Sequence, residues 1–359
     1  MTSRERVLTA MRRQAPDRVP HEIGISLTPQ KYEEFRTRTG QEDAAAYFGC
    51  DTRPVGILRT SHPLDHAKYH TDSPPGTTWD EWGIGYLKTR SDAPEHAHLQ
   101  AFVHPMMKLS SDADAASYPL PDVEADYRYA DLPGRIASIQ GEGHAAMASS
   151  ECSIFEIAWY MRSMELLLLD FVENPGFAET LLDRITAKRE IQAARYSALG
   201  VDVIRLGDDV ASQHGMMMSV PMWRRWLKPR LARIIAAAKA ARPDVLVFYH
   251  TDGNATAIVP DLIEIGLDIL NPIQSECMDP ACLKREFGRD LAFWGTIGTQ
   301  STLPFGTPED VRAEVKLRME TVGVGGGLLL APTHMIEPEV PWENIVAAVD
   351  AVNEFGWYR

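Results

Sequence analysis

The chain has 359 residues, of which 45% are hydrophobic and 24% are charged. That balance is typical of a folded globular protein and excludes a disordered or membrane-embedded chain. The formal net charge of −14 argues against a nucleic-acid partner, because phosphate backbones are bound by clustered Lys and Arg. No stretch reaches the roughly 18 apolar residues of a membrane span, and the N-terminus lacks the apolar core of a signal peptide. We therefore expect a cytoplasmic protein that acts on a small molecule.

Eight short apolar runs rich in β-branched residues alternate along the chain with longer segments of helical period. The runs lie at 18–26, 51–59, 144–150, 201–207, 244–250, 267–273, 291–298 and 327–334. The clearest helices are predicted at 161–175, 175–200, 220–243, 307–323 and 341–356. Repeated strand–helix–strand units build a parallel sheet. Eight of them favour a closed (β/α)8 TIM barrel over an open doubly wound sheet.

We expect one domain over residues 1–359, with an insertion at about 60–125 between the second and third strands. The insertion is rich in Pro, His and Asp and contains TTWDEWGIGYLKTR and AFVHPMM, which predict an antiparallel excursion near one barrel mouth. The segment GVGGGL at 323–328 precedes a strand instead of following one, so we interpret it as a loop and not as a phosphate-binding motif. The four cysteines form no CxxC pair and are expected to be free thiols. The sequence leaves a homodimer open.

Polar residues cluster where the predicted strands end. In a barrel the carboxyl ends of all strands meet on one face, and catalytic groups lie there. His250 and Asp252 follow the fifth strand in the turn HTDGN, and His334 ends the eighth. Two imidazoles and one carboxylate on one face can hold a divalent metal and leave positions open for substrate. The alternatives are a hydrogen-bonding or general-acid His, and an Asp that serves only the turn.

Further strand-end residues complete the candidate site. Asp208 and Asp209 follow the fourth strand, and because consecutive side chains rarely serve one site, we expect one functional carboxylate and one helix cap. We assign Asp208 to catalysis and Asp209 to substrate binding. Glu156 lies in the first turns of an apolar helix, where it either contacts substrate, as a catalytic candidate, or caps the helix. The other expected substrate contacts are Gln213, Asn271 and Gln274.

Several segments resemble the uroporphyrinogen decarboxylase-like superfamily, and together they cover nearly the whole chain. They include RERVLTAMRRQAPDRVP, ENPGFAETLLDRI, LGDDVASQHGMMMSVPMWRRWLKPRL, DLAFWGTIGTQSTLPFGTPEDVRAEV and GGGLLLAPTHMIEPEVPWENIVAAVDAVNEFG. The resemblance implies a (β/α)8 barrel, in agreement with the strand count. It is less specific about the reaction, because the superfamily holds both cofactor-free decarboxylases and corrinoid-linked methyltransferases.

The resemblance to the methyltransferases concerns the metal ligands. Those enzymes bind zinc through a His-x-Cys pair after the fifth strand and a further Cys after the eighth. His250-Thr251-Asp252 falls on the pair with Asp in place of Cys, and His334 falls at or near the last ligand. The resemblance therefore implies a divalent metal, with Zn²⁺ as the expected ion, and metal-dependent methyl transfer that demethylates a small methylated substrate. No DxHxxG-type cobalamin motif is present, so any corrinoid is expected on a separate partner protein.

Two alternatives stay open. The first is a cofactor-free decarboxylase of a porphyrinogen-like or other carboxylated substrate, with Asp51 and His334 positioning the substrate. The basic RQAGRY-like motif of those decarboxylases is missing here, where VPHEIGISLTPQKYEEF stands, although His334 matches their late histidine. The second is a non-catalytic ligand-binding barrel. Metal content of the purified protein separates the decarboxylase from the methyltransferase.

Overall fold

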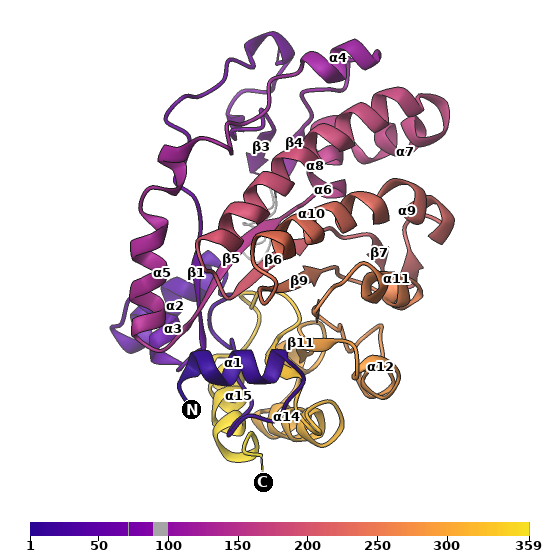
Figure 1. The fold of residues 1–359 in the computed structure, drawn as a ribbon. Helices are drawn as coiled ribbons and strands as arrows, with labels where there is room; N and C mark the ends of the chain where they lie inside the picture. Colours follow the sequence, from indigo (N-terminus) through magenta and orange to yellow (C-terminus); the bar gives the residue numbers. More distant parts are fainter. Residues whose placement is uncertain (71, 89–99, 359) are drawn as a thin grey trace.

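A seven-stranded parallel sheet forms the centre of the computed structural model, which describes residues 1–70, 72–88 and 100–358 (Figure 1). The strand order is β1-β5-β6-β9-β10-β11-β12. Each lies inside a predicted strand, except that β5 extends one residue past its predicted end, which confirms the α/β class. Their bounds are β1 Thr52–Val55, β5 Ala145–Glu151, β6 Val203–Gly207, β9 Leu246–His250, β10 Ile269–Asn271, β11 Ala292–Ile297 and β12 Leu328–Pro332.

The remaining predicted strand, 18–26, forms sheet-like hydrogen bonds mainly at its centre. The Glu22 N–H donates to the Leu330 carbonyl of β12 at 2.9 Å, and the Leu330 N–H donates to the Pro20 carbonyl at 2.9 Å. On the other side, the Asp51 N–H donates to the His21 carbonyl at 3.1 Å. Residues 20–22 thus link β12 to the start of β1, which are the two edges of the sheet. Pro20 has no N–H and cannot extend this pairing.

Helices surround the sheet and follow the strands (Figure 1). The predicted helix at 220–243 is divided at Leu227, because Pro229 stands in the first turn of the second half, where its missing N–H is tolerated. Among the described residues no helix has the length and apolarity to cross a membrane. The helices are α1 Ser3–Met11, α2 Pro29–Thr39, α3 Ala44–Tyr47, α4 Asp112–Ser117, α5 Leu132–Gly141, α6 Phe155–Arg162, α7 Met164–Glu173, α8 Pro175–Ala198, α9 Val220–Trp226, α10 Lys228–Ala241, α11 Val259–Glu264, α12 Pro280–Phe287, α13 Thr302–Phe305, α14 Pro308–Thr321 and α15 Trp342–Phe355.

Helix α1 covers the amino-terminal ends of the strands. The N–H of Arg4 donates to Gly143, just before β5, and its guanidinium pairs with Asp202, just before β6. The apolar side of α1 packs on inward-facing residues of the strands and forms with them a core separate from the one under the outer helices. This inner core contains Val7, Ala10, Met11, Ala145, Met147, Val203, Leu246, Phe248, Ile269, Ala292, Trp294, Leu329 and Ala331. The space inside the sheet is therefore filled at its amino-terminal end.

Between β1 and β5 the chain forms a three-stranded antiparallel sheet of β2 Thr78–Trp79, β3 Gly85–Lys88 and β4 Gln100–Val103. These strands lie within the stretch predicted as an insertion, of which residue 71 and residues 89–99 lie outside the described part of the chain. Phe102 of β4 stacks on Tyr160 of α6, with ring centroids 4.3 Å apart. The antiparallel sheet thus contacts the helix that follows the carboxyl end of β5.

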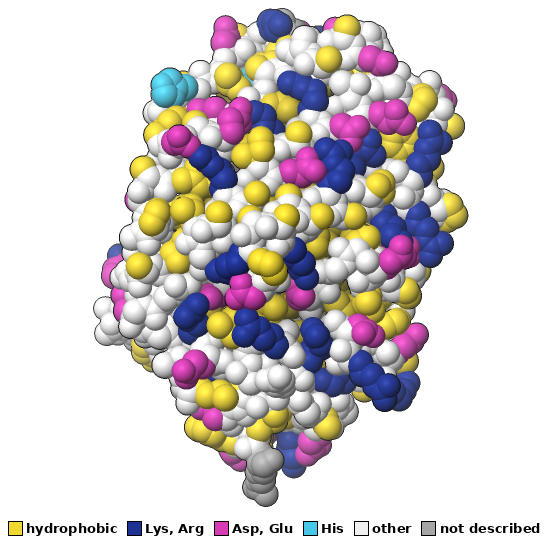
Figure 2. All heavy atoms as spheres, viewed as in Figure 1, with side chains coloured by type: hydrophobic (Ala, Val, Ile, Leu, Met, Phe, Trp, Pro, Cys, Tyr) yellow, Lys and Arg dark blue, Asp and Glu magenta, His cyan; other side chains and the backbone are white. Residues whose placement is uncertain are grey.

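The outer helices carry mixed charges. On the face shown in Figure 2, basic and acidic side chains are interspersed, and ion pairs such as Arg233–Glu190 connect α10 with α8. No continuous basic surface of the kind that binds nucleic acid is visible on the described residues of this face.

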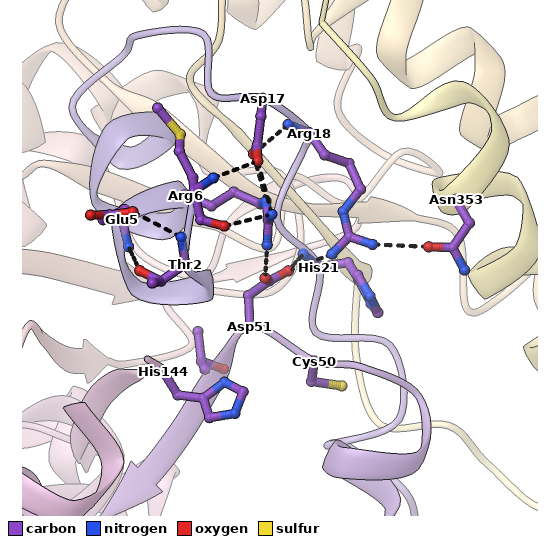
Figure 3. A network of polar contacts seen from close by, with 12 residues as sticks. Thr2, Glu5, Arg6, Asp17, Arg18, His21, Cys50, Asp51, His144 and Asn353 are labelled. Carbon is purple, nitrogen blue, oxygen red and sulfur yellow. Dashed lines mark hydrogen bonds and ion pairs between the residues drawn. The ribbon is translucent and has the colours of Figure 1, made fainter. Parts of the chain in front are cut away.

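A buried ion network joins the N-terminal segments to β1 (Figure 3). The Asp51 carboxylate has no solvent-exposed surface. It accepts hydrogen bonds from Arg6 Nη1 at 2.7 Å, Arg18 Nη2 at 3.3 Å and the His21 N–H at 3.0 Å. Asp51 precedes β1 and so lies at the amino-terminal end of the sheet. This corrects the expectation that Asp51 positions substrate: its carboxylate is occupied by arginines at the end of the strands opposite to the candidate site.

Replacing Asp51 by Asn should lower the free energy of unfolding by about 3–5 kcal/mol, because Arg6 and Arg18, whose side chains are only 12% and 13% exposed, lose the carboxylate that they share, and Arg6 keeps only Asp17. Asp126→Asn is the matched control, since Asp126 is 92% exposed and pairs with Arg195 at the surface, where an ion pair contributes about 0–1 kcal/mol. Urea unfolding of both variants measures the difference. Equal small losses in both would contradict a structural role for Asp51.

Candidate active site

A pocket of about 360 Å³ lies at the carboxyl ends of the strands. Residues from six of the seven strands or their following turns line it, together with the segment that links the sheet edges. The lining is Glu22, Ser26, Glu151, Cys152, Glu156, Tyr160, Arg205, Asp209, His250, Asn271, Trp294 and residues 331–335. A larger cavity of about 600 Å³ lies between the turn after β1 and the antiparallel sheet, but none of the strand-end candidates lines it.

Three potential metal ligands, Asp209, His250 and Asp252, have ligand atoms that all lie within 4.8 Å of one another. Asp209 and His250 line this pocket, whereas Asp252 lines the adjoining cavity of about 440 Å³ together with His334. His250 Nε2 is 3.7 Å from Asp209 Oδ1 and 3.7 Å from Asp252 Oδ1. The sheet register explains this. Gly207 of β6 lies beside His250 of β9, so the two aspartates, each two residues further along, also become neighbours. The Asp252 N–H donates to Asp209 Oδ1 at 2.8 Å.

The donor set fits a divalent cation. Asp252 Oδ1 is buried and has no hydrogen-bond partner, a state that costs about 1–3 kcal/mol for a polar group. A cation shared with His250 Nε2 would satisfy this oxygen and would balance the two neighbouring carboxylates. Two carboxylates with imidazole suit several divalent ions, zinc among them.

A contact with the side chain of Asn271 fixes the orientation of the His250 ring. Its Nδ1 lies 2.6 Å from Asn271 Oδ1, and Asn271 Nδ2 donates to the Trp294 carbonyl at 2.9 Å. Because the amide nitrogen is committed to that carbonyl, the amide oxygen faces His250 and accepts from Nδ1–H. Nε2 then carries the lone pair on the side of Asp209 and Asp252. Asn271 lines the pocket as expected, and its side chain also positions a potential metal ligand.

His334 lies at the edge of this group. Its Nε2 is 3.8 Å from Asp252 Oδ2, and half of its side chain is exposed. The structure therefore brings His250 and Asp252 together with Asp209, which sequence reasoning assigns to substrate binding, and places His334 beside Asp252 but outside this group of three. The signal for Asp209 is its position two residues after the end of β6, which matches that of Asp252 after β9.

Burial and the neighbouring charges shift the pKa values of His250 and Asp252. Burial opposes the charged form of His250, but the Asp252 and Asp209 carboxylates outweigh it, and the pKa of His250 is raised. Burial also raises the pKa of Asp252, with Asp209 adding to the effect and His250 opposing it. A divalent cation would replace these protons, so metal binding should release protons.

Asp208 and Glu156 serve different purposes. The buried Asp208 carboxylate accepts the N–H groups of Ile154 and Glu156 at 3.0 and 2.9 Å, and so caps α6; burial raises its pKa to about 7. Asp208 does not line the pocket. Glu156 does, and its Oε1 accepts the Tyr160 hydroxyl at 3.0 Å. Burial, with the nearby Asp209 and Asp208, raises the pKa of Glu156 to about 8.

Two expected substrate contacts lie elsewhere. Gln274 Oε1 accepts the Gly253 N–H at 3.0 Å and supports the turn that carries Asp252; it lines a neighbouring cavity of about 440 Å³ that also meets His334. Gln213 is exposed on the hairpin of β7 Ala211–Ser212 and β8 Gly215–Met216, where its amide bonds Gln300. The hairpin carries Gln213 away from the pocket, which corrects that expectation.

Sequence reasoning missed two pocket residues inside the sheet, Glu22 and Arg205. Arg205 stands in the run VDVIRLG, where a single charge interrupts apolar residues. In a strand that alternates between two faces, such a charge signals an inward polar position. The sequence carries this signal, but interpreting it requires knowing which face of the strand is turned toward the pocket.

Comparisons with known proteins support one family. The profile described as Uroporphyrinogen decarboxylase (URO-D) matches residues 114–355. Methylcobamide:CoM methyltransferase MtaA of Methanosarcina barkeri is 29% identical over 215 residues, which are 60% of this chain and only 57% of that protein. A uroporphyrinogen decarboxylase of Alkalilimnicola ehrlichii is 24% identical over 368 residues, covering 98% of this chain and 93% of that one. A solved methyltransferase from Methanosarcina mazei shares the fold, with a TM-score of 0.71, 19% identity and 99% of both chains covered.

Asn271→Leu should weaken Zn²⁺ binding by about 10- to 100-fold, because His250 loses the acceptor that fixes its tautomer. Asn271→Asp, which keeps an acceptor at that position, should bind Zn²⁺ about as tightly as the wild type. Calorimetric titration of metal-free protein measures both. Unchanged affinity in Asn271→Leu would show that the contact with His250 does not matter for the metal.

Glu156→Gln should change how stability depends on pH. The ordinary pKa of a Glu is 4.5 and that of Glu156 in the folded chain is about 8, so the folded chain keeps a proton that the unfolded chain releases. This contribution to stability is complete below about pH 4.5 and is lost as pH rises to about 8. The variant should therefore lose less stability than the wild type between pH 5 and 8, by on the order of a few kcal/mol. Urea unfolding in the presence of a chelator tests this; parallel pH curves would refute it.

Proposed function

The chain belongs to the uroporphyrinogen decarboxylase family, and from that premise we propose that it is a metal-dependent methyltransferase that demethylates a small methylated substrate. One observation carries this proposal: Asp209, His250 and Asp252 hold their ligand atoms within 4.8 Å of one another, between the strand-end pocket and the adjoining cavity. His334 extends the group on the Asp252 side. The name of the MtaA relative, a methyltransferase that acts between a methylcobamide and CoM, points in the same direction.

The charges of the pocket favour methyl transfer over porphyrinogen decarboxylation. A porphyrinogen carries many carboxylates and needs basic partners. The pocket offers one arginine, Arg205, against the carboxyl groups of Glu22, Glu151, Glu156 and Asp209. Burial raises the pKa of Glu22 and of Glu156 and favours their neutral forms, so a polyanion would meet one cation and the carboxylates of Glu151 and Asp209. Its further carboxylates would find no basic partner among the described lining residues. A small substrate with few charges suits this lining better.

Asp209, His250 and Asp252 would hold a divalent metal, with Zn²⁺ as the expected ion, and such a metal would supply the Lewis acidity to activate a nucleophile or polarise the methylated group. Asp209 and Asp252 would balance its charge, and Asn271 orients His250 so that Nε2 faces the two carboxylates. Glu156 holds a proton near neutral pH. Because the Tyr160 hydroxyl donates to Oε1, that proton sits on Oε2 and can be given to a leaving oxygen or nitrogen.

The methyl carrier is part of the proposal. No cobalamin-binding motif stands in the sequence, so a corrinoid would reach the pocket on a separate protein. We further propose that the chain is one domain, a closed eight-stranded barrel, since residues 20–22 hydrogen-bond to both edges of the sheet. The antiparallel sheet would be an insertion between the second and third barrel strands that borders the mouth, as its contact with Tyr160 suggests.

Asp252→Ala should reduce Zn²⁺ affinity at least about 100-fold, because a hard anionic ligand is lost, with little loss of fold, since Asp252 lies in a turn. Asp244→Ala is the matched control: Asp244 precedes β9, as Asp252 follows it, but is 68% exposed. Elemental analysis after metal loading and calorimetry measure the effect. Asp252→Cys should shift the preference toward zinc over manganese. Equal metal content in the wild type and in Asp252→Ala would contradict the proposed site.

Because methyl transfer is reversible, the reaction is tested in the reverse direction, with methylcobalamin as the methyl donor and a small thiol, the demethylated form of a thioether substrate, as the acceptor, following the loss of the methylated corrinoid spectrum. Transfer should require added Zn²⁺ and should be lost in Asp252→Ala but kept in Asp244→Ala. Metal-independent decarboxylation of uroporphyrinogen, with no methyl transfer, would instead support the decarboxylase alternative. A non-catalytic barrel would show neither activity.

A further inference from the structure

Arg205 is the only Lys or Arg among the residues that line the pocket. It extends from the middle of β6, two residues before the strand ends at Gly207, whereas Asp209 lies two residues beyond that end. Four residues of extended chain span about 13 Å at most. The backbone of Arg205 therefore lies further from the strand ends than the Asp209–His250–Asp252 group, and its guanidinium reaches Glu151, which lies beside Gly207 in the sheet. The two places are close enough for one small molecule to bridge.

The guanidinium of Arg205, whose side chain is 20% exposed, makes fewer protein hydrogen bonds than those of three buried arginines of the chain. Arg128, Arg162 and Arg189 each donate hydrogen bonds from all three guanidinium nitrogens to protein acceptors. Arg205 makes one such bond, from Nη2 to Glu151 Oε1 at 2.8 Å. Its Nε is buried without a partner, and Nη1 has no protein acceptor among the described residues.

The neighbours of Arg205 do not supply the missing acceptors. Phe248 covers one face of the guanidinium, with its ring centroid 4.7 Å away. Both oxygens of the Glu22 carboxyl are already used, by the Thr52 hydroxyl at 2.8 Å and by Trp294 Nε1 at 2.9 Å. Burial raises the pKa of Glu22 despite Arg205, which favours its neutral form. Arg205 thus keeps free donors, and the pocket lies beside them.

We propose that Arg205 binds a carboxylate or sulfonate at one end of the small substrate, while the reacting end lies at the Asp209–His250–Asp252 group. A guanidinium forms charge-assisted, often bidentate, bonds with such planar or trigonal anions. The pocket suits a substrate with a single anionic group. Glu151 and Glu156 also line it, and no second Lys or Arg stands among the described lining residues to bind another anion. The assignment of the reacting end rests on the proposed function; the anion site at Arg205 does not.

The experiment compares ligands that differ only in their charged end. Zn²⁺-loaded protein is titrated calorimetrically with 2-mercaptoethanesulfonate, 3-mercaptopropionate and neutral 2-mercaptoethanol. The two anionic thiols should bind about 10-fold or more tightly than the neutral one, as a charge-assisted bond predicts. Arg205→Met should remove this preference and leave the affinity for 2-mercaptoethanol unchanged. Arg59→Met, in the separate cavity of about 600 Å³, is the control and should keep the preference.

Two further variants separate ligand binding from a purely structural role. Glu151→Gln removes the carboxylate that competes for Arg205, so it should tighten binding of both anionic thiols several-fold; a structural ion pair predicts no such gain. Arg205→Lys keeps the charge without the planar fork and should retain a reduced preference, which gives a usable result if Arg205→Met does not fold. An unchanged preference in Arg205→Met, or none in the wild type, overturns the inference.

A titration of metal-free protein separates a failure of the proposed metal site from a failure of the anion site at Arg205. If no thiol binds the Zn²⁺-loaded wild type, the proposed function fails, and metal-free protein is titrated with propane-1-sulfonate and with 1-propanol. A preference for the sulfonate that Arg205→Met removes supports the anion site by itself. Equal binding of both, or binding of neither, overturns it.

Discussion

A buried carboxylate, that of Asp51, holds together the place where the two edges of the parallel sheet meet. It receives Arg6 from α1, Arg18 from the following segment and the N–H of His21, while residues 20–22 pair with β12 on the other side. Breaking a buried charge pair is far more costly than the pair's net contribution suggests, because the remaining charges stay uncompensated. The convergence of the carboxyl ends of the strands, and hence the site, depends on this closure.

The register of the sheet then determines which side chains meet. On β6 and β9, Gly207 lies beside His250, and a Cβ at position 207 would come within 2.8 Å of the His250 Cβ. Only glycine allows this approach without displacement of His250. On the other flank, Asn271 of β10 pairs with His250, which places the amide that orients the imidazole. Each potential ligand is thus supported by a neighbouring strand.

Much of this arrangement could be predicted from the sequence. Apolar β-branched runs identify the seven strands, and the HTDGN turn identifies two members of the candidate metal group, His250 and Asp252, with His334 at its edge. What could not be predicted depends on relations between segments. Asp209 is a neighbour of Asp252 only because of the register between β6 and β9. Arg205 lines the pocket only because its side of β6 is turned toward the pocket. Asp51 was assigned to substrate although it lies at the start of its strand, because its arginine partners come from a helix and a turn that sequence patterns did not connect with it.

The filling of the amino-terminal end by α1 has a kinetic consequence. With Val7, Ala10 and Met11 packed against the inner faces of the strands, the described residues leave the carboxyl-end mouth as the route to the pocket. If a bulky second reactant covers that mouth, as the proposed corrinoid protein would, a small reactant must enter first, and its product must leave after the second reactant has departed. The proposed reaction would then follow a compulsory order of addition and release, in which an excess of the bulky reactant inhibits by trapping or excluding the small one.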